Sequence, residues 1–420
     1  MTTIEDTRVW HPFAPMGQVR EAEMVLVRGE DVWVFDEDGN RYLDATASLW
    51  YANVGHGRKS IADAVGKQMA ELEAYSTFGD FTNRPAEEIS AKLAELAPIP
   101  DAKVFLTSGG GDSIDTAAKL ARRYWHEVGQ TSRHHLISRQ HGYHGTHGFG
   151  TGLAGIPPNR EGYGEVAADA SVVAWNDPAA LREEIERVGP DRVAAFFIEP
   201  VIGAGGVYPP PEGYVEEVAA ICSEYGVLFV VDAVINAFGR LGTWFGIERW
   251  PDVVPDMITF AKGVTSGYLP LGGVVISGEI AAPFWEPGAP PFRHGATYGG
   301  HPTCCAAGIE NLRILEEEGL LPRGEELEGP LYEQMLRAAD SPNVAEVRGG
   351  LGFLAAVEIA GEILEADPGA PIKLGMAARE QGVLMRPLGR GVAVSPPLTA
   401  TEEHLQMIGD AIEKSVATLG

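Results

Sequence analysis

The sequence predicts an α/β fold with a mostly parallel sheet, joined to a smaller α+β domain that both ends of the chain build together. Two observations favour it: short, uniformly apolar runs, and segments of helical periodicity that alternate with them. Uniformly apolar strands are typical of a sheet that helices cover on both faces, and alternation with helices favours parallel pairing. We expect residues 1–60 to be the N-terminal segment of the small domain, residues 61–318 the large domain, and residues 319–420 the C-terminal part of the small domain.

The elements follow from local patterns. The first strands are expected at residues 23–29, 31–36 and 42–45, and the sequence D-E-D-G-N before Arg41 predicts a hairpin turn. A helix is expected from Pro85, because proline is favoured in the first turn of a helix. The later elements are expected in this order: a strand at 103–107, a tight glycine turn and a helix at 115–125, a strand at 193–201, a helix at 213–225, strands at 227–234, 257–263 and 272–277, a helix at 302–318, strands at 347–359 and 392–396, and a helix from Thr401.

Charge and cysteine content exclude several classes of function. The chain of 420 residues has 59 acidic and 32 basic side chains, a formal charge of −27, and no basic run. This balance argues against nucleic acid or an anionic membrane as a partner. Its three cysteines, two of them adjacent, cannot form a disulfide framework. The N-terminus is too polar for a signal peptide and no apolar stretch reaches membrane-spanning length, so we expect a cytoplasmic protein.

Lys262 is the only lysine between Lys119 and Lys373. It follows an apolar run and precedes a glycine-rich turn. Burial there would lower the pKa of its amino group, which suits a nucleophile that forms an imine. The alternative is a surface lysine in a chain that otherwise prefers arginine.

Asp232 ends the apolar run V-L-F-V-V-D, and open α/β sheets bind ligands beyond the carboxyl ends of their strands. Its carboxylate could hold a protonated ring nitrogen, a ribose hydroxyl or a metal. The structural alternative is an aspartate that caps a helix or a turn.

The glycines at 109–111 join a strand to a helix, and bare backbone amides at a helix N-terminus bind anions. No G-K-[ST] sequence follows, which excludes a triphosphate loop, and the dinucleotide spacing G-x-G-x-x-G is also absent at this turn. A single phosphate group is therefore the favoured ligand.

Five histidines fall within residues 134–147, and the alternative functional interpretation of this cluster is a metal site. The glycines at 142, 145 and 148 oppose a regular helix, and no compact set of cysteine or carboxylate ligands accompanies the cluster, so we expect no metal. Tyr143 could instead supply a flat face for an aromatic ligand. A phosphate cradle, a flat face, an acid for a ring nitrogen and an imine-forming lysine together indicate pyridoxal 5'-phosphate.

With these motifs in order, the chain resembles the class III aminotransferases of the omega-transaminase, amine:pyruvate type, which belong to the fold type I pyridoxal-phosphate enzymes. The resemblance runs from W-H-P-F at Trp10 to S-P-P-L-T at Ser395 and implies a seven-stranded sheet in the large domain. The motifs that match are F-L-T-S-G-G-G-D-S-I-D-T from Phe105, Y-H-G from Tyr143, I-E-P from Ile198, D-A-V-I-N-A-F-G-R-L-G from Asp232, K-G-V-T-S-G-Y-L-P-L-G from Lys262, and H-G-A-T-Y-G-G-H-P from His294.

The resemblance implies a role for each matching residue. Lys262 is the catalytic Schiff-base lysine and Asp232 the partner of the ring nitrogen. The other cofactor positions are Gly110 and Gly111 at the phosphate, Tyr143 and Val234 on opposite faces of the ring, His144, Glu199, and Thr297, which reaches the phosphate of the neighbouring subunit in a homodimer. The implied substrate positions are Tyr143, Trp50, which lines the pocket, and Arg386, which binds a carboxylate unless it is an exposed strand-end residue.

Three positions depart from the family pattern. Ala233 replaces a glutamate, Ala237 replaces a glycine, and Gly111 replaces a serine while keeping its backbone amide. None of them removes a group that imine chemistry requires.

The implied reaction moves an amino group from a primary amine or an omega-amino acid to a keto acid such as pyruvate, with Lys262 as general base and acid. The alternatives within the family are a diaminopelargonate aminotransferase, a dialkylglycine-type decarboxylase and a semialdehyde aminomutase. A non-catalytic binding protein on this scaffold and a metal-dependent hydrolase built on the histidine cluster are the alternatives from other classes.

Overall fold

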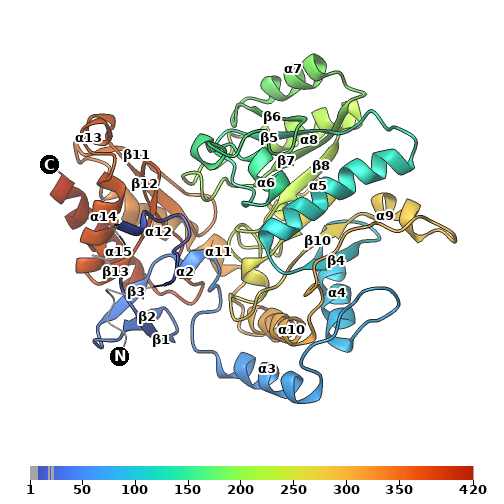
Figure 1. Cartoon of the computed structure of the whole chain (residues 1–420). Helices are drawn as coiled ribbons and strands as arrows, with labels where there is room; N and C mark the ends of the chain where they lie inside the picture. Colours follow the sequence, from blue (N-terminus) through green and yellow to red (C-terminus); the bar gives the residue numbers. More distant parts are fainter. Residues whose placement is uncertain (1–7, 18, 20–22, 420) are drawn as a thin grey trace.

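The computed structural model describes residues 8–17, 19 and 23–419. Its largest sheet has seven strands (Figure 1). In spatial order its strands are β4 (Lys103–Thr107), β10 (Gly272–Ile276), β9 (Met257–Phe260), β8 (Leu228–Asp232), β7 (Val193–Ile198), β5 (His135–Arg139) and β6 (Ala170–Val173). The five strands from β9 to β6 are parallel, whereas β10 is antiparallel to both of its neighbours. The prediction of a mostly parallel α/β sheet is confirmed.

Helices cover both faces of this sheet. Successive residues of a strand point to opposite faces, so each strand contributes side chains to two hydrophobic cores. In β8, Phe229 and Val231 belong to the main core, while Leu228 and Val230 belong to a second core on the other face. Residues of α4 (Arg84–Leu96), α7 (Pro178–Val188), α8 (Tyr214–Tyr225) and α10 (Pro302–Glu317) belong to the main core, and α3 (Lys59–Glu71) packs on α10. Residues of α5 (Gly110–Glu127), α6 (Gly148–Leu153) and α9 (Gly278–Trp285) fill the second core.

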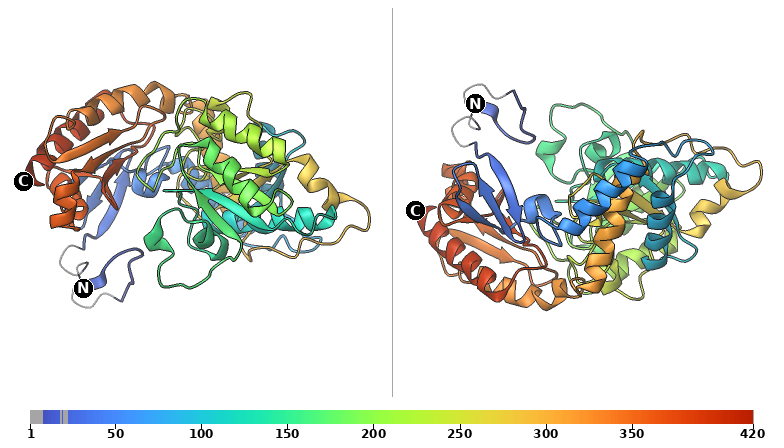
Figure 2. Two further views of the ribbon diagram at one scale, coloured as in Figure 1. Left: turned by 90° about the horizontal axis from the view of Figure 1, so that it is seen from above. Right: turned by 90° about the horizontal axis from the view of Figure 1, so that it is seen from below.

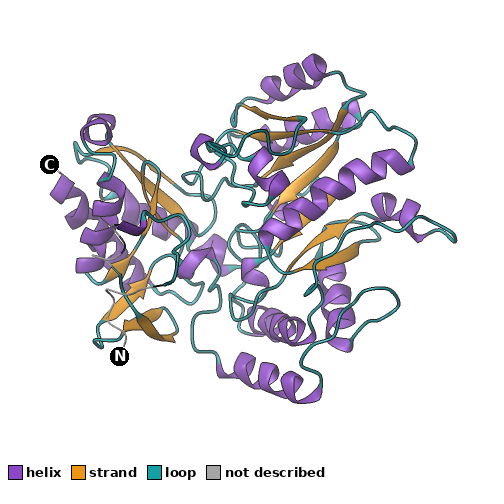
Figure 3. Ribbon diagram, viewed as in Figure 1, coloured by secondary structure: helices purple, strands orange, loops and turns teal. Residues whose placement is uncertain are grey.

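Both ends of the chain build two further four-stranded sheets, drawn in orange in Figure 3. One consists of β1 (Leu26–Glu30), β2 (Trp33–Asp36), β3 (Arg41–Asp44) and β13 (Val383–Leu384), and the other of β11 (Val344–Arg348), β12 (Ala355–Ile359), β15 (Gly391–Val394) and β14 (Arg386–Leu388). Because β13 pairs with β3 in parallel, the first strands lie beside the C-terminal elements, blue beside red in Figure 2. The neighbouring helices are α11 (Arg323–Glu326), α12 (Glu328–Leu336), α13 (Gly361–Ala366), α14 (Ala370–Glu380) and α15 (Glu402–Val416). The domain boundaries after residues 60 and 318 remain predictions.

Helix starts agree with the capping residues in the sequence. Asn83 caps α4, since its side chain accepts a hydrogen bond of 2.9 Å from the backbone N–H of Ala86. Thr401 caps α15. The prediction of one strand at 347–359 is wrong, because the glycines at 349, 350 and 352 adopt positive φ values and separate β11 from β12.

Among the described residues, no helix has both the length and the apolar character needed to cross a membrane.

Candidate active site

A cavity of about 550 Å³ lies where β7, β8 and β9 end, on the carboxyl side of the parallel strands. Its size falls within the roughly 300–1,000 Å³ that small-molecule sites occupy. The structure brings together at this cavity most of the residues that the sequence singled out: Trp50, Gly110, Gly111, Tyr143, His144, Glu199, Asp232, Val234, Lys262 and Arg386.

Lys262 is the second residue after β9 and opens a short 3₁₀ turn with a positive φ of 46°. Burial lowers the pKa of its amino group to about 8, although the carboxylates of Asp232 and Glu199 act in the opposite direction. A neutral amine, the form that acts as a nucleophile and a base, is therefore accessible near neutral pH.

Asp232 is buried at the end of β8, and three donors fix its carboxylate. One oxygen accepts hydrogen bonds from the hydroxyl of Thr259 (3.2 Å) and the backbone N–H of Val234 (3.1 Å), and the other lies 2.8 Å from Nδ1 of His144. The opposite ring nitrogen of His144, Nε2, is buried and has no hydrogen-bond partner among the residues that the structure describes. These contacts hold the carboxylate in one orientation at the cavity wall.

Glu199 follows β7 and holds the loop that carries Tyr143. Its two carboxylate oxygens accept hydrogen bonds of 2.9 Å from the backbone N–H groups of Tyr143 and Gly203. Burial raises the pKa of Glu199, and the nearby charge of Asp232 adds to the rise. Its geometry makes it an anchor for the aromatic ring of Tyr143.

The N-terminus of α5 forms the cradle expected for a phosphate. The first N–H groups of a helix have no intrahelical partner, and here they belong to small residues that leave the backbone accessible. A Cβ atom on Gly110 would lie 3.0 Å from Val234, and one on Gly111 would lie 3.3 Å from the ring of His147. A side chain at either position would have to displace its neighbour by a few tenths of an ångström, so glycine favours this close packing. The residues at the cavity fit pyridoxal phosphate.

The wall that carries Trp50 is a strained turn after β3. Within α2 (Ala47–Trp50), three residues other than glycine have positive φ: Ala47 (45°), Ser48 (58°) and Trp50 (65°). Each such residue costs on the order of 1–3 kcal/mol and persists only where surrounding contacts impose it. Trp50 is only 3% exposed, whereas Leu49 beside it is 43% exposed and also lines the cavity.

Sequence reasoning missed several residues of the cavity wall. Phe13 lies edge-on to the ring of Tyr143, with the ring centroids 6.4 Å apart, and Ile156 and Leu49 complete apolar parts of the wall. Phe13 belongs to the W-H-P-F motif and Leu49 directly precedes Trp50, so the sequence contained a motif that could have indicated both as site residues. Ile156 had none, because the loop after α6 shows no pattern that points to a site.

Thr297 does not line this cavity. It is exposed on the loop that precedes α10. Arg386, by contrast, lies in β14 and faces the cavity, where burial lowers the pKa of its guanidinium group. Ala233 and Ala237 are buried in the main core, so these two departures from the family pattern affect packing.

The five histidines of residues 134–147 have separate partners. His134 lies 3.5 Å from Asp169, the ring of His135 lies 2.8 Å from the hydroxyl of Ser171, and His141 stacks on Tyr208; His144 and His147 contact Asp232 and Asp112, respectively. In the part of the chain that the structure describes, no group of three or more metal-ligating side chains is placed to hold a metal ion.

The site combines a lysine after one parallel strand, a carboxylate at the end of the neighbouring strand in the sheet, and an anion cradle at a helix N-terminus. This combination is typical of a pyridoxal-phosphate-dependent enzyme. Residues 16–416 match the family described as aminotransferase class III. The putrescine–pyruvate aminotransferase of Pseudomonas aeruginosa is 36% identical over 411 residues, which cover 92% of this chain and 89% of that protein.

Two solved structures are similar over nearly the whole chain. An (S)-enantioselective omega-transaminase from Thermomicrobium roseum has a TM-score of 0.94 at 37% identity, covering 99% of this chain and 97% of its own. An amine transaminase from an uncultivated Pseudomonas species, in a PLP-bound form, has a TM-score of 0.93 at 32% identity and covers 99% of both chains. The chain belongs to the class III aminotransferases. It is a PLP-dependent transaminase of the fold type I class.

Proposed function

We propose that this transaminase moves an amino group from a primary amine or an omega-amino acid to a keto acid such as pyruvate. The observation that supports this proposal is a single cavity that combines Lys262, Asp232 and Arg386 with apolar walls. A panel of amine donors with pyruvate or 2-oxoglutarate as acceptor tests it, and an enzyme that turns over no such pair contradicts it.

Pyridoxal phosphate supplies an aldehyde that condenses with primary amines and a ring that accepts electrons from the substrate carbon. In our proposal, the amides of Gly110 and Gly111 hold its phosphate, and Tyr143 and Val234 contact the two faces of its ring. Asp232, oriented by His144, holds a proton on the ring nitrogen. The amino group of Lys262 would be the base that takes a proton from the substrate carbon and the acid that gives it back in the transfer.

The walls of the cavity favour donors with an apolar side chain. Phe13, Leu49, Trp50 and Ile156 are apolar residues of the cavity wall. The relative from Pseudomonas aeruginosa is named for putrescine and pyruvate. The carboxylates that line the cavity here, Glu199 and Asp232, already accept hydrogen bonds from protein donors. We therefore propose an amine with an apolar side chain as the donor and pyruvate as the acceptor.

Arg386→Ala is expected to raise KM for pyruvate roughly 10- to 150-fold, since a hydrogen bond to a charged group contributes about 1.5–3 kcal/mol. An aldehyde acceptor without a carboxylate should show little change. Steady-state kinetics with both acceptors measure the difference. Arg390→Ala is the matched control, because Arg390 is close in the chain and pairs with Glu358 at 2.5 Å instead of facing the cavity. Equal effects of Arg386→Ala on both acceptors would count against this role.

We also propose a homodimer in which Thr297 contacts the cofactor phosphate of the partner subunit. Thr297 lies outside its own cavity, and exposed aromatic side chains are found on its loop and on the adjoining segment before α4. The two segments are in contact, since the hydroxyl of Thr77 donates to the carbonyl of Gly299 at 3.1 Å. Exposed apolar patches of this kind are typical of protein interfaces. The exposed aromatic residues are Tyr75, Phe78, Phe81 and Tyr298.

Thr297→Ala should weaken retention of the cofactor roughly 10- to 150-fold, the value of one hydrogen bond to a charged group, while Lys262 keeps its reactivity. Cofactor absorbance after dialysis measures retention, and light scattering measures the assembly. Thr418→Ala, at the far C-terminus, should change neither. A fully active monomer would contradict both the dimer and the role of Thr297.

A further inference from the structure

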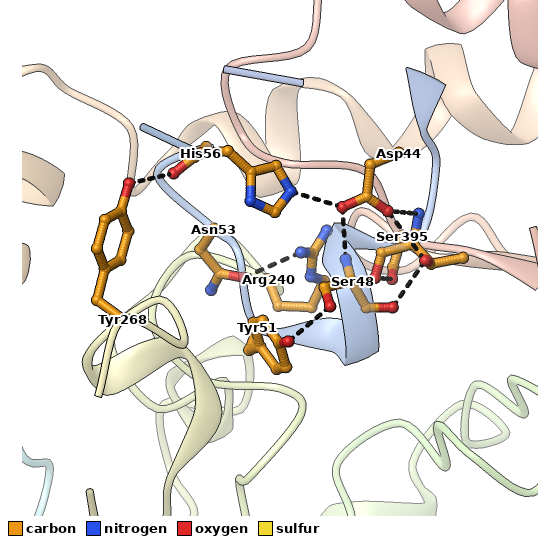
Figure 4. A network of polar contacts seen from close by, with 10 residues as sticks. Asp44, Ser48, Tyr51, Asn53, His56, Arg240, Tyr268 and Ser395 are labelled. Atoms are coloured by element: carbon orange, nitrogen blue, oxygen red, sulfur yellow. Dashed lines mark hydrogen bonds and ion pairs between the residues drawn. The ribbon is translucent and has the colours of Figure 1, made fainter. Parts of the chain in front are cut away.

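The strained turn that carries Leu49 and Trp50 is held by a buried carboxylate, Asp44, at the end of β3 (Figure 4). One oxygen of Asp44 accepts hydrogen bonds from the backbone N–H (3.2 Å) and the hydroxyl (3.0 Å) of Thr46. The other accepts one of 2.6 Å from the backbone N–H of Ser48. A carboxylate can hold several donors at once, so Asp44 binds both Thr46, which precedes the turn, and the backbone N–H of Ser48, which has a positive φ.

The remaining contact of Asp44 is His56, whose Nε2 lies 2.8 Å from the same oxygen that binds Ser48. The backbone of His56 is itself fixed, because it exchanges two hydrogen bonds with Asp31, of 2.7 and 2.9 Å. Gly29 leaves the space for the side chain of His56: a Cβ atom there would lie 2.7 Å from that of His56. Three segments of the chain thus converge to place one imidazole against Asp44.

The chain that leads from the turn to His56 is anchored from the other side by Arg240, which is fully buried. Its guanidinium group donates to the side-chain oxygen of Asn53 at 3.0 Å and to the carbonyls of Phe353 and Pro396 at 2.8 and 2.7 Å. Asn53 also donates to the carbonyl of Phe238 at 2.8 Å. The segment therefore has a fixed end at Asn53. The turn before it is held by Asp44 and by two further hydrogen bonds, from the hydroxyl of Thr46 to the carbonyl of Ser48 (2.8 Å) and from the hydroxyl of Ser395 to the carbonyl of Thr46 (3.3 Å).

Neither Asp44 nor His56 lines the cavity, but Leu49 and Trp50 do. We propose that Asp44 and His56 are a positioning pair: their hydrogen bond keeps the turn in its strained conformation and sets how tightly the cavity binds the side chain of the amine donor. The pair acts through Trp50 and Leu49 and has no part in proton transfer at Lys262. The kinetic part of this inference rests on the proposed function, and the conformational part does not.

The test compares His56→Leu, which cannot donate to Asp44, with His56→Gln, whose side-chain N–H can. With pyruvate as acceptor, His56→Leu should raise KM for 1-phenylethylamine about tenfold and change kcat less than about threefold, the pattern of lost ground-state binding. KM for isopropylamine, which has no aromatic ring to pack on Leu49 and Trp50, should change less than about threefold. His56→Gln should restore most of the lost affinity. His134→Leu is the matched control, since His134 forms a histidine–aspartate pair far from the cavity.

Hydrogen exchange supplies a readout that does not depend on turnover. In His56→Leu, the amides of residues 46–51 should exchange at least about tenfold faster, because the turn opens locally when its anchor is lost, while the helix α5 should be unchanged. If His56→Leu does not fold, Gly29→Ala takes its place, since the added methyl group displaces His56 without removing it.

Several results would overturn the inference. They are unchanged exchange at residues 46–51, an equal rise in KM for both donors, a fall in kcat alone, or a His56→Gln variant as impaired as His56→Leu. A wild-type enzyme that turns over no amine would refute the proposed function, while the exchange measurement would still decide whether the pair holds the turn.

Discussion

Lys262→Ala is expected to lower turnover by more than about 10⁴-fold, because the general acid–base role alone contributes about 10²–10⁴-fold and the covalent role is lost with it. The variant should still bind pyridoxal phosphate, since the amides of Gly110 and Gly111 and the carboxylate of Asp232 do not depend on the lysine. Single-turnover kinetics with an amine donor measure the loss. A small exogenous amine should restore part of the rate, because it can move the proton that Lys262 moves.

Lys373→Ala is the control for this experiment. Lys373 is exposed, pairs with Asp367 at 2.7 Å, and should be replaceable without loss of turnover. In the wild-type protein, borohydride should fix the cofactor on the peptide that contains Lys262, as mass spectrometry can show. An adduct on Lys119 or Lys373, or near-normal turnover in Lys262→Ala, would refute the assignment of the catalytic lysine.

Asp232→Asn is expected to lower kcat roughly 30- to 5,000-fold, because removing one partner from a buried, charge-assisted pair costs about 2–5 kcal/mol. An amide has no negative charge to hold a proton on the ring nitrogen. It also replaces one carboxylate oxygen by an NH₂ group, so that either His144, or both Thr259 and Val234, lose their acceptor. The absorbance spectrum of the bound cofactor should shift, which separates this effect from a loss of binding.

Asp256→Asn is the matched control for that substitution. Asp256 lies at the opposite ends of the same strands, where it accepts a hydrogen bond of 2.7 Å from the backbone N–H of Phe229. Burial raises the pKa of its carboxyl to about 6. An asparagine oxygen can accept the same bond, so turnover should be unchanged. If the two variants were equally impaired, the effect would lie in the sheet and not in the chemistry at Asp232.

The sequence was most informative at the ends of strands, where both the element and the site residue could be predicted. The strand at 103–107 has the predicted bounds, and Asp232 stands at the end of β8 as expected. Lys262 follows β9, and Gly110 and Gly111 begin α5 just after β4, so all three lie at the edge where these strands end. In such positions the local pattern fixes both the element and its place in the sheet, so a motif is sufficient. The chemical role of each residue stays a prediction until it is tested.

What the sequence could not predict depends on contacts between distant segments. The positive φ values at Ala47, Ser48 and Trp50 have no signature, since none of these residues favours that conformation. They exist because Asp44 and His56 impose them, and the position of His56 depends in turn on the missing side chain of Gly29. No local pattern relates these three residues.

The parallel pairing of β13 with β3 also determines when the protein can become complete during its synthesis. Leu43 and Asp44 of β3 pair with Val383 and Leu384, which the ribosome makes about 340 residues later. At about 5–20 residues per second, that interval lasts roughly 20–70 s. During this interval, β3 lacks its partner strand β13, and its free edge is open to pairing with other nascent chains. Arg386 is made later still, so the proposed site cannot be whole before this part of the chain has been synthesised.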